Sequence, residues 1–505
     1  MPQSPAGLLK ALDALTGQVA TEADRQVAVW VPMIQRAAFR PSAANLACYL
    51  AFRRRDLRRL QRPLMALGLS SLGRLEGRVI PTLKAVRRAL GALASPPTGT
   101  EPTAHSGADP DFLAGEVRLA ANAEAIFGAP TAPGAVALMV TCPSEAAKHP
   151  AFMAMMVEKR VQAVRINCAH DTPRAWKHMI RHLRDAEAAS GRRVRIFMDL
   201  AGPKIRTGTV HCHKGHKRAR VGDIIAMCAP GTLHAAREGA HVHIAVECTL
   251  PQALYDARPG DRLLVDDGLL EAEVTRGEAW GIVARVLAAP KKGLQIRPEK
   301  GVNFPGGRSD IAALTDKDRR DLKFVSAHAD AIEYSLVQSA ADVVLLQDAL
   351  AALRPDDWRS QALVLKIETA RAVRNLPEII VQAAAHQPTA IMIARGDLAV
   401  EIGFSRTAEI QEEILWLGEA ADVPVIWATQ VLDGLIRTGE ASRGEMTDAA
   451  MAARAECVML NKGPFLAEGI DQLRILLARM TDHQHKKTPQ LRALKSWGSP
   501  VAQKP

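Results

Sequence analysis

The spacing of apolar residues changes along the chain. Residues 1–94 carry them at helical intervals, with amphipathic stretches at 8–15 and 45–67. The following segment, 95–110, is rich in Pro, Gly, Thr and Ser and is typical of a linker. From about Pro133, short apolar and β-branched runs alternate with helical segments. This alternation predicts βαβ units around a parallel sheet.

Eight such runs can be counted, and eight parallel strands close a (β/α)₈ barrel. The runs are 136–141, 163–167, 194–200, 330–335, 362–368, 390–397, 423–429 and 456–461. The sequence therefore predicts an α/β protein of the TIM-barrel class.

A long segment without helical pattern follows the third run. It contains Gly-Asp turns before apolar runs, at Gly222-Asp223 and Gly260-Asp261, and is expected to form an inserted small β-barrel domain. An insert grown from a βα loop lies on the catalytic face of a barrel, where it is suited to act as a lid.

Five segments are therefore expected along the chain. They are an N-terminal helical region (1–94), a linker and lead-in (95–132), the catalytic barrel (133–208 and 299–485), the β lid (209–298) and a tail (486–505).

Composition limits the classes of function. No apolar run is long enough to span a membrane, and the N-terminus lacks the apolar core of a signal peptide. The seven cysteines are scattered, which suits a reducing compartment, so a cytoplasmic protein is expected. A net charge of +11 suits a nucleic-acid partner or anionic substrates. Because no aromatic residues interleave the densest basic run, 53–60, no nucleic-acid partner is expected.

Polar and charged residues stand at or near the end of every run, where barrel active sites form. They are Thr141; Arg165 and Asn167; Asp199; Ser335; Lys366 and Glu368; Arg395 and Asp397; Thr429; and Asn461.

Spacing gives these residues a common direction. Arg165 and Asn167 are two apart, as are Lys366 and Glu368, so each pair points to one face of its strand. Glu368 and Asp397 suit Mg²⁺. The side chains of Arg165 and Lys366 suit phosphate oxygens. Together these groups favour phosphoryl transfer, which depends mainly on positioning and charge neutralisation.

At this point the chain resembles the pyruvate kinase family, from about residue 135 to 463. Several segments carry the resemblance, in the family's order: Val164-Arg165-Ile166-Asn167-Cys168-Ala169-His170; Met198-Asp199-Leu200-Ala201-Gly202-Pro203-Lys204-Ile205-Arg206; Val265-Asp266-Asp267-Gly268; Lys300-Gly301-Val302-Asn303-Phe304-Pro305; Ala313-Leu314-Thr315-Asp316; Leu365-Lys366-Ile367-Glu368; Ile393-Ala394-Arg395-Gly396-Asp397-Leu398; and Val425-Ile426-Trp427-Ala428-Thr429-Gln430. The resemblance implies transfer of a phosphoryl group from phosphoenolpyruvate to ADP, the last step of glycolysis, by a protein expected to be a homo-oligomer.

The resemblance also implies residue roles. Arg165 would bind the phosphate of phosphoenolpyruvate, and Lys366 would neutralise the phosphoryl group in transfer. Glu368 and Asp397 would hold Mg²⁺, or Mn²⁺ in its place. The Gly396-Asp397 backbone would receive the substrate carboxylate.

Further roles follow from the same resemblance. Thr429 would help to deliver a proton to the enolate carbon. Asn167, His170 and Arg206 would face the nucleotide. Asn167 and Asp199, together with Lys204, would line the monovalent-cation region.

The chain departs from the family pattern at several positions. Potassium-dependent members have Ser at the position of Ala169 and Glu at that of Lys204, so no requirement for K⁺ is expected. Ser335-Leu336-Val337-Gln338 loses an Arg, and Asn461-Lys462-Gly463-Pro464 replaces the usual Ser-Gly-Glu-Thr. The family's C-terminal regulatory domain is expected to be absent.

Other functions remain open at this stage. A metal-dependent pyruvate or phosphoenolpyruvate aldolase or lyase would use the same carboxylates and Arg165. A catalytically impaired metabolite-binding relative would fit the altered segment after Leu460. A zinc site at His211-Cys212-His213 with His216 matches no established ligand spacing and is disfavoured.

Overall fold

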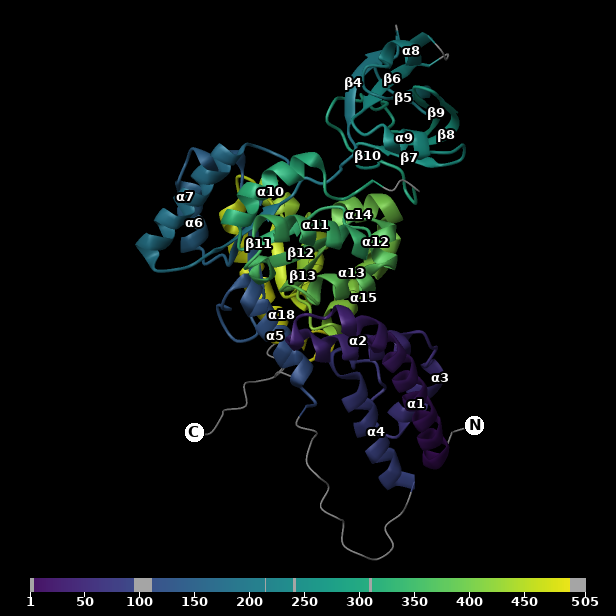
Figure 1. The fold of residues 1–505 in the computed structure, drawn as a ribbon, viewed down its shortest axis with the longest axis vertical. Coiled ribbons are helices and arrows are strands. Elements are labelled where there is room, and N and C mark those ends of the chain that lie inside the picture. Colours follow the sequence, from purple (N-terminus) through teal and green to yellow (C-terminus); the bar gives the residue numbers. More distant parts are fainter. Residues whose placement is uncertain (1–3, 95–110, 214, 239–241, 308–310, 491–505) are drawn as a thin grey trace, which may run out of the picture.

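The computed structural model describes residues 4–94, 111–213, 215–238, 242–307 and 311–490 (Figure 1). The predicted linker at 95–110 lies outside these residues. Among them, eight parallel strands close a barrel in the order β1-β15-β14-β13-β12-β11-β3-β2. The strands are β1 (Ala137–Thr141), β2 (Ala163–Asn167), β3 (Arg195–Asp199), β11 (Ala331–Tyr334), β12 (Ala362–Ile367), β13 (Thr389–Ala394), β14 (Val425–Ala428) and β15 (Cys457–Leu460). The predicted barrel is confirmed, and all eight strands coincide with the expected runs.

Strand burial explains why the barrel could be read from the sequence. Side chains on one face fill the interior, among them Met139, Phe197 and Met392, while the other face packs against the surrounding helices. Both faces are therefore buried, and the strands appear as nearly continuous apolar runs. The surrounding helices include α6 (Ala151–Glu158), α7 (Pro173–Ser190), α10 (Asp316–His328), α11 (Ala340–Leu353), α13 (Leu376–Ala384), α15 (Phe404–Ala420), α17 (Arg443–Met451) and α18 (Leu466–Thr481).

A helix that the sequence did not predict covers the N-terminal end of the barrel. It is α5 (Ala114–Phe127), which lies within the segment expected to be a linker and lead-in. Its last residues, Ile126 and Phe127, are buried, and Phe127 stacks on Phe197 with 5.9 Å between ring centroids. The helix therefore closes the end of the barrel interior that lies away from the expected active site.

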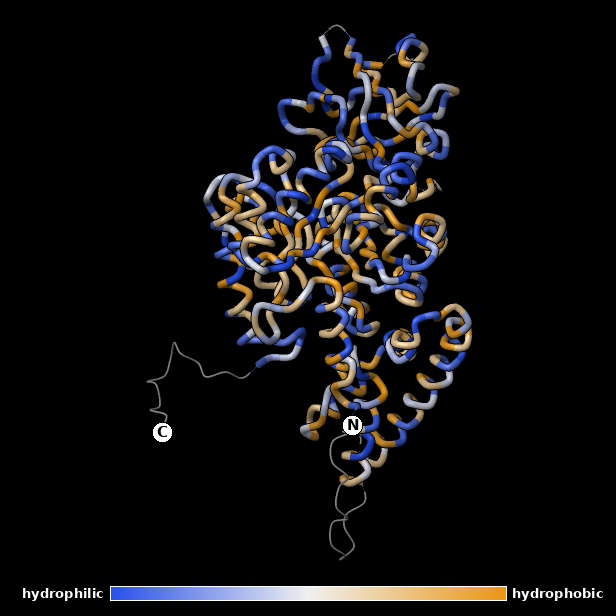
Figure 2. The backbone as a smooth tube through the Cα atoms, turned by 60° about the vertical axis from the view of Figure 1, so that its left-hand side comes forward, coloured by the Kyte–Doolittle hydropathy of each residue, from blue (hydrophilic) through white to orange (hydrophobic). Residues whose placement is uncertain are grey.

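The described residues of the N-terminal region include four α-helices: α1 (Pro5–Trp30), α2 (Arg40–Arg53), α3 (Arg58–Ala66) and α4 (Val79–Ala94). Figure 2 shows mixed hydrophobic and hydrophilic positions along them, as expected for amphipathic helices. The region is fastened to the barrel near the end of α15. There Asn45 donates to the Ala420 carbonyl at 2.8 Å, and Ser42 donates to Asp422 at 2.7 Å. Arg118 of α5 also pairs with Asp422, at 2.7 Å.

The insert after β3 folds into a seven-stranded sheet of order β10-β7-β8-β9-β5-β6-β4. Its strands are β4 (Thr207–Cys212), β5 (Ile224–Cys228), β6 (Ile244–Cys248), β7 (Arg262–Val265), β8 (Leu270–Glu278), β9 (Gly281–Ala288) and β10 (Val302–Asn303). The Gly-Asp turns precede β5 and β7, as the pattern predicts. In Figure 1 the insert lies at the end of the barrel opposite the N-terminal helices.

Two expectations about the chain as a whole can be compared with the structure. None of the described helices combines the length and the apolar character that a membrane span requires. All seven cysteines lie among the described residues, and each is a free thiol there.

Candidate active site

A buried cluster of charges lies at the C-terminal ends of the strands. Lys366 of β12 is 7% exposed and is surrounded by oxygen atoms. Its Nζ lies 3.0 Å from both carboxylate oxygens of Asp199, 2.6 Å from Ser335 Oγ and 3.3 Å from Glu368 Oε1. Ser335 in turn donates to Asp199 at 2.9 Å. Three neighbouring strands, β3, β11 and β12, thus bring these side chains together at one end of the barrel.

Arg165 of β2 joins this cluster and is 9% exposed. Its Nε donates to Glu333 Oε2 at 2.9 Å and its Nη1 to Thr141 Oγ1 at 3.2 Å, while Nη2 donates to Asp199. The guanidinium is therefore held in one orientation by three partners. Arg165 and Lys366 share Asp199 between them, so two positive charges lie on one small region of the barrel end.

Sequence reasoning missed Glu333, which is completely buried on β11. A signal was present, because Glu333 precedes Ser335 by two residues and so points to the same face of the strand. Its second oxygen, Oε1, has no hydrogen-bond partner within the described part of the chain. Burial raises the pKa of Glu333 to about 7, although Arg165 acts in the opposite direction.

The surroundings favour the charged forms of Asp199 and Lys366. Burial opposes the charge of Asp199, but Lys366 and Arg165 outweigh it and lower its pKa. Burial likewise opposes the charge of Lys366, yet Asp199 and Glu368 raise its pKa. The cluster is therefore a set of mutually dependent charges, in which removal of one partner leaves another buried and uncompensated.

The residues expected to hold Mg²⁺ have donor chemistry suited to that ion. Glu368 is buried, and its pKa is raised first by burial and then, against the influence of Lys366, by the charge of nearby Asp397. Two neighbouring carboxylates favour a cation between them, and carboxylate oxygens are ligands that Mg²⁺ prefers. Glu368 also accepts from the backbone N–H of Leu336 at 2.5 Å, which orients the carboxylate. Lys204 Nζ lies 2.6 Å from Asp397 Oδ1. The ammonium group of Lys204 thus already places one positive charge beside the two carboxylates.

Thr429 and Gly396 meet at the ends of β13 and β14. The Gly396 N–H donates to Thr429 Oγ1 at 2.8 Å. Thr429 has a left-handed backbone conformation, with φ of 65°, which is uncommon for a β-branched residue. Arg395 supports it by donating to the Thr429 carbonyl at 2.7 Å, and Asp448 holds Arg395 in turn. Strained backbone that is held in this way is common at functional sites.

Two openings adjoin the cluster. One of about 130 Å³ lies between the barrel and the insert, and its lining includes Lys204, Glu368 and Asp397. The other, of about 320 Å³, lies beside Arg165.

The opening beside Arg165 contains two of the three predicted nucleotide residues, Asn167 and His170. Arg206 lies elsewhere, at the base of the insert, where it donates to the Glu299 carbonyl at 2.9 Å. Lys462, which follows the end of β15, lines the opening as well. The sequence had shown Lys462 only as a departure from the family pattern.

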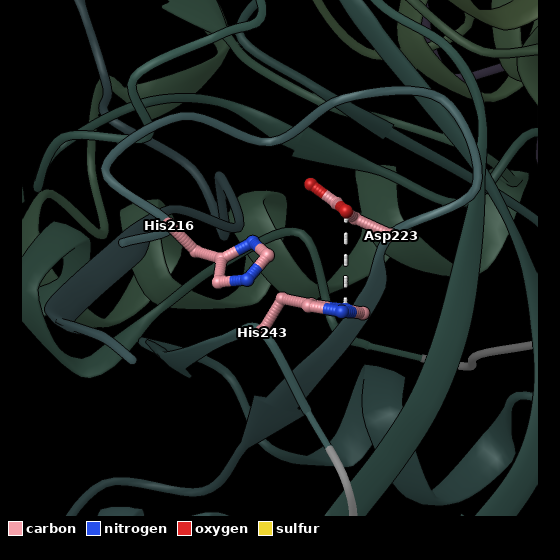
Figure 3. Close-up of side chains that lie close together, drawn as sticks. All are labelled: His216, Asp223 and His243. Atoms are coloured by element: carbon pink, nitrogen blue, oxygen red, sulfur yellow. Dashed lines mark ion pairs between the residues drawn. The ribbon is translucent and has the colours of Figure 1, made fainter. Parts of the chain in front are cut away.

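The insert gathers a different set of histidines from the one considered in the sequence. Figure 3 shows His216 and His243 beside Asp223. One possible ligand atom from each of the three side chains lies within 4.8 Å of the others. His243 Nδ1, however, accepts a hydrogen bond from the Ile224 N–H at 2.8 Å, and Asp223 accepts one from the Arg220 N–H at 2.8 Å. These backbone contacts account for the positions of both side chains without a metal ion.

Comparisons with known proteins agree with the geometry. A family model described as the pyruvate kinase barrel domain matches residues 137–467. A pyruvate kinase of Corynebacterium efficiens is 32% identical over 309 residues, which cover 61% of this chain and 60% of the relative. One of Mycobacterium tuberculosis is 31% identical over 315 residues, covering 61% of each chain. One of Agrobacterium vitis is 30% identical over 360 residues, covering 69% of this chain and 70% of the relative.

The chain spans about 60% of the length of the first two relatives. The match includes all eight barrel strands and the insert, together with every residue of the buried charge cluster. This protein belongs to the pyruvate kinase family.

Proposed function

We propose that this protein transfers the phosphoryl group of phosphoenolpyruvate to ADP in the presence of Mg²⁺. The observation that carries the proposal is the shared contact of Arg165 and Lys366 with Asp199, next to Glu368. Two fixed cations beside a carboxylate pair suit a small trianion that must be bound and neutralised while it reacts.

In the proposed reaction, the P–O bond to the enolate oxygen breaks and a bond to a β-phosphate oxygen of ADP forms. Arg165 orients the phosphoryl group, and Lys366 compensates the charge on its oxygens during transfer. Glu368 and Asp397 would hold Mg²⁺, which supplies positive charge next to the substrate oxygens. The Gly396-Asp397 backbone borders the position proposed for the substrate carboxylate.

The enolate carbon then takes up one proton to give pyruvate. Thr429 is the proposed group beside this carbon, and delivery through water fits its hydroxyl, which already accepts from Gly396. The insert lies over the same end of the barrel and would exclude bulk water when it closes.

A coupled assay with phosphoenolpyruvate, ADP and Mg²⁺ tests the proposal, and pyruvate formation that requires ADP is the expected result. An aldolase or lyase would release its product without ADP. A catalytically impaired relative would bind phosphoenolpyruvate, measured by calorimetry, without forming pyruvate. Either of these two results would overturn the proposal.

Activity should not require K⁺. Lys204 Nζ lies 2.6 Å from Asp397, and a fixed ammonium can take the place of a bound monovalent cation. We expect the same rate in sodium-only and potassium buffers of equal ionic strength. Lys204→Gln removes the built-in charge and should make the rate respond to K⁺. A wild-type rate that collapses in sodium would contradict this expectation.

Lys462 should contribute to nucleotide affinity. It lines the opening with Arg165 and His170, and its ammonium group forms no ion pair with any described residue. Lys462→Ala should raise the KM for ADP about tenfold, because an interaction with a phosphate oxygen is lost. The KM for phosphoenolpyruvate should stay unchanged. Lys148→Ala, which removes a lysine outside this lining, serves as the control, and a rise in both KM values would argue against this role.

A further inference from the structure

A second cavity lies at the N-terminal end of the barrel, away from the buried charge cluster. Its volume is about 200 Å³. It is bounded by α5, by the C-terminal end of α15, by the segments that lead into β1 and β15, and by a hairpin of β16 (Gln484–His485) and β17 (Thr488–Pro489). Nothing in the proposed phosphoryl transfer uses this cavity.

One wall of the cavity is apolar. Its residues come mainly from one side of α5 and from the approach to β1, and they include Leu119, Ala120, Ala123, Phe127 and Val136. Leu119 and Phe127 are nearly inaccessible to solvent. A ligand with a small apolar body would therefore gain affinity by packing against this wall.

The opposite side of the cavity carries more carboxylates than ammonium groups. Three carboxylates, Glu76, Glu419 and Glu456, lie near two ammonium groups of the hairpin. Lys486 pairs with Glu456, and Lys487 pairs with Glu76. Glu419 lines the cavity, and no described residue donates a hydrogen bond to its carboxylate. Among these five groups the carboxylates outnumber the ammonium groups by one.

The surroundings of Glu419 disfavour its ionised form. Burial raises its pKa to about 7, with Glu76 and Glu456 acting in the same direction and Lys486 and Lys487 against it. Two other charges at the cavity form ion pairs of their own, although Arg454 Nε has no hydrogen-bond partner among the described residues. Arg454 pairs with Glu412 at 2.6 Å, and Glu116 of α5 pairs with Arg78. Glu124 of α5 is exposed at the rim and adds negative charge, and His485 also lines the cavity.

We propose that this cavity binds a small organic cation, a primary ammonium group on a short apolar body. The ammonium would pair with Glu419, while the apolar body would pack on α5. A cation completes the charge of the carboxylate cluster, whereas an anion would add to the excess of carboxylates. A purely apolar ligand would leave Glu419 desolvated and unpaired.

Benzylamine is a suitable probe, with benzyl alcohol as its uncharged counterpart. The full-length protein should bind benzylamine at one site in a calorimetric titration, and its Tm should rise with benzylamine concentration. Benzyl alcohol should bind at least about tenfold more weakly, because it lacks the charge-assisted contact. Benzylamine binding that is absent, or no tighter than that of the alcohol, would overturn the proposal.

The pH dependence tests the role of Glu419. An aliphatic ammonium stays protonated between pH 6 and 8, while a carboxyl group with a pKa of about 7 ionises across this range. Benzylamine affinity should therefore increase about tenfold from pH 6 to pH 8.

Three variants separate Glu419 from its neighbours. Glu419→Gln should weaken binding and abolish the pH dependence. Glu124→Gln is the matched control, because it removes the same charge at the exposed rim and should change affinity little. Ala123→Leu fills part of the cavity and should weaken both probes while leaving Glu419 in place. Unchanged binding and pH dependence in Glu419→Gln would exclude the assignment.

Discussion

Replacement of Lys366 by Met should reduce turnover at least about 10³-fold, because the charge that compensates the transferring phosphoryl group is lost. The side chain is 7% exposed and in contact with Asp199, Ser335 and Glu368, so no solvent cation can take its place without disturbing the cluster. Mn²⁺ binding should persist, because Glu368 and Asp397 remain. The measurement is the coupled rate, together with Mn²⁺ affinity by calorimetry.

A control is needed for the general effect of removing a lysine. Lys323 lies exposed on α10, and Lys323→Met should leave the rate unchanged. If Lys366→Met kept turnover within about tenfold of the wild type, the assignment of Lys366 to phosphoryl transfer would be wrong. If it lost Mn²⁺ affinity as well, the loss of rate would be explained by a disrupted site rather than by the missing charge.

Replacement of Arg165 by Met should destabilise the protein as well as inactivate it. Removing one partner of a buried ion pair costs about 3–5 kcal/mol, and here both Glu333 and Asp199 lose a contact. Asp199 keeps Lys366 and Ser335, whereas Glu333 is left buried with no other hydrogen-bond or ion-pair partner among the described residues. Most of the loss in the free energy of unfolding should therefore come from Glu333.

The double variant Arg165→Met/Glu333→Met separates the two effects. An apolar pair in place of a buried ion pair is often neutral for stability, so the double variant should recover most of the lost free energy of unfolding. Activity should stay low, because the proposed phosphate ligand is still missing. Arg195→Met is the control for a partly exposed arginine, whose pair with Asp330 at 3.3 Å should contribute less than about 1 kcal/mol. A double variant that is no more stable than Arg165→Met would show that Glu333 is not the cause.

The barrel could be predicted because both faces of its strands are buried, which leaves short apolar runs with polar residues at their ends. Helix α5 escaped prediction for a physical reason. It is rich in alanine and follows a segment of turn-forming residues, so little periodicity marks where it begins. Its function depends on a tertiary contact, the stacking of Phe127 on Phe197, which no local pattern reveals.

The candidate site was predictable where chemistry stands at the end of a strand, as with Lys366 and Glu368. Glu333 lies inside a run, where the surrounding apolar residues favour an ordinary core position. Its partner Arg165 is 168 residues away in the sequence, so their pairing depends on the closed order of the strands. The separation of Arg206 from His170 likewise depends on where the chain leaves the barrel, which spacing alone does not determine.

The position of Lys204 links movement to electrostatics. This lysine lies in the segment that connects β3 to the insert, and its ammonium group reaches Asp397 on the barrel. A swing of the insert away from the barrel would carry that ammonium with it and leave Asp397 to attract a metal ion from solution. Opening of the insert would therefore withdraw the positive charge of Lys204 from Asp397 at the same time as it widens the entrance to the site.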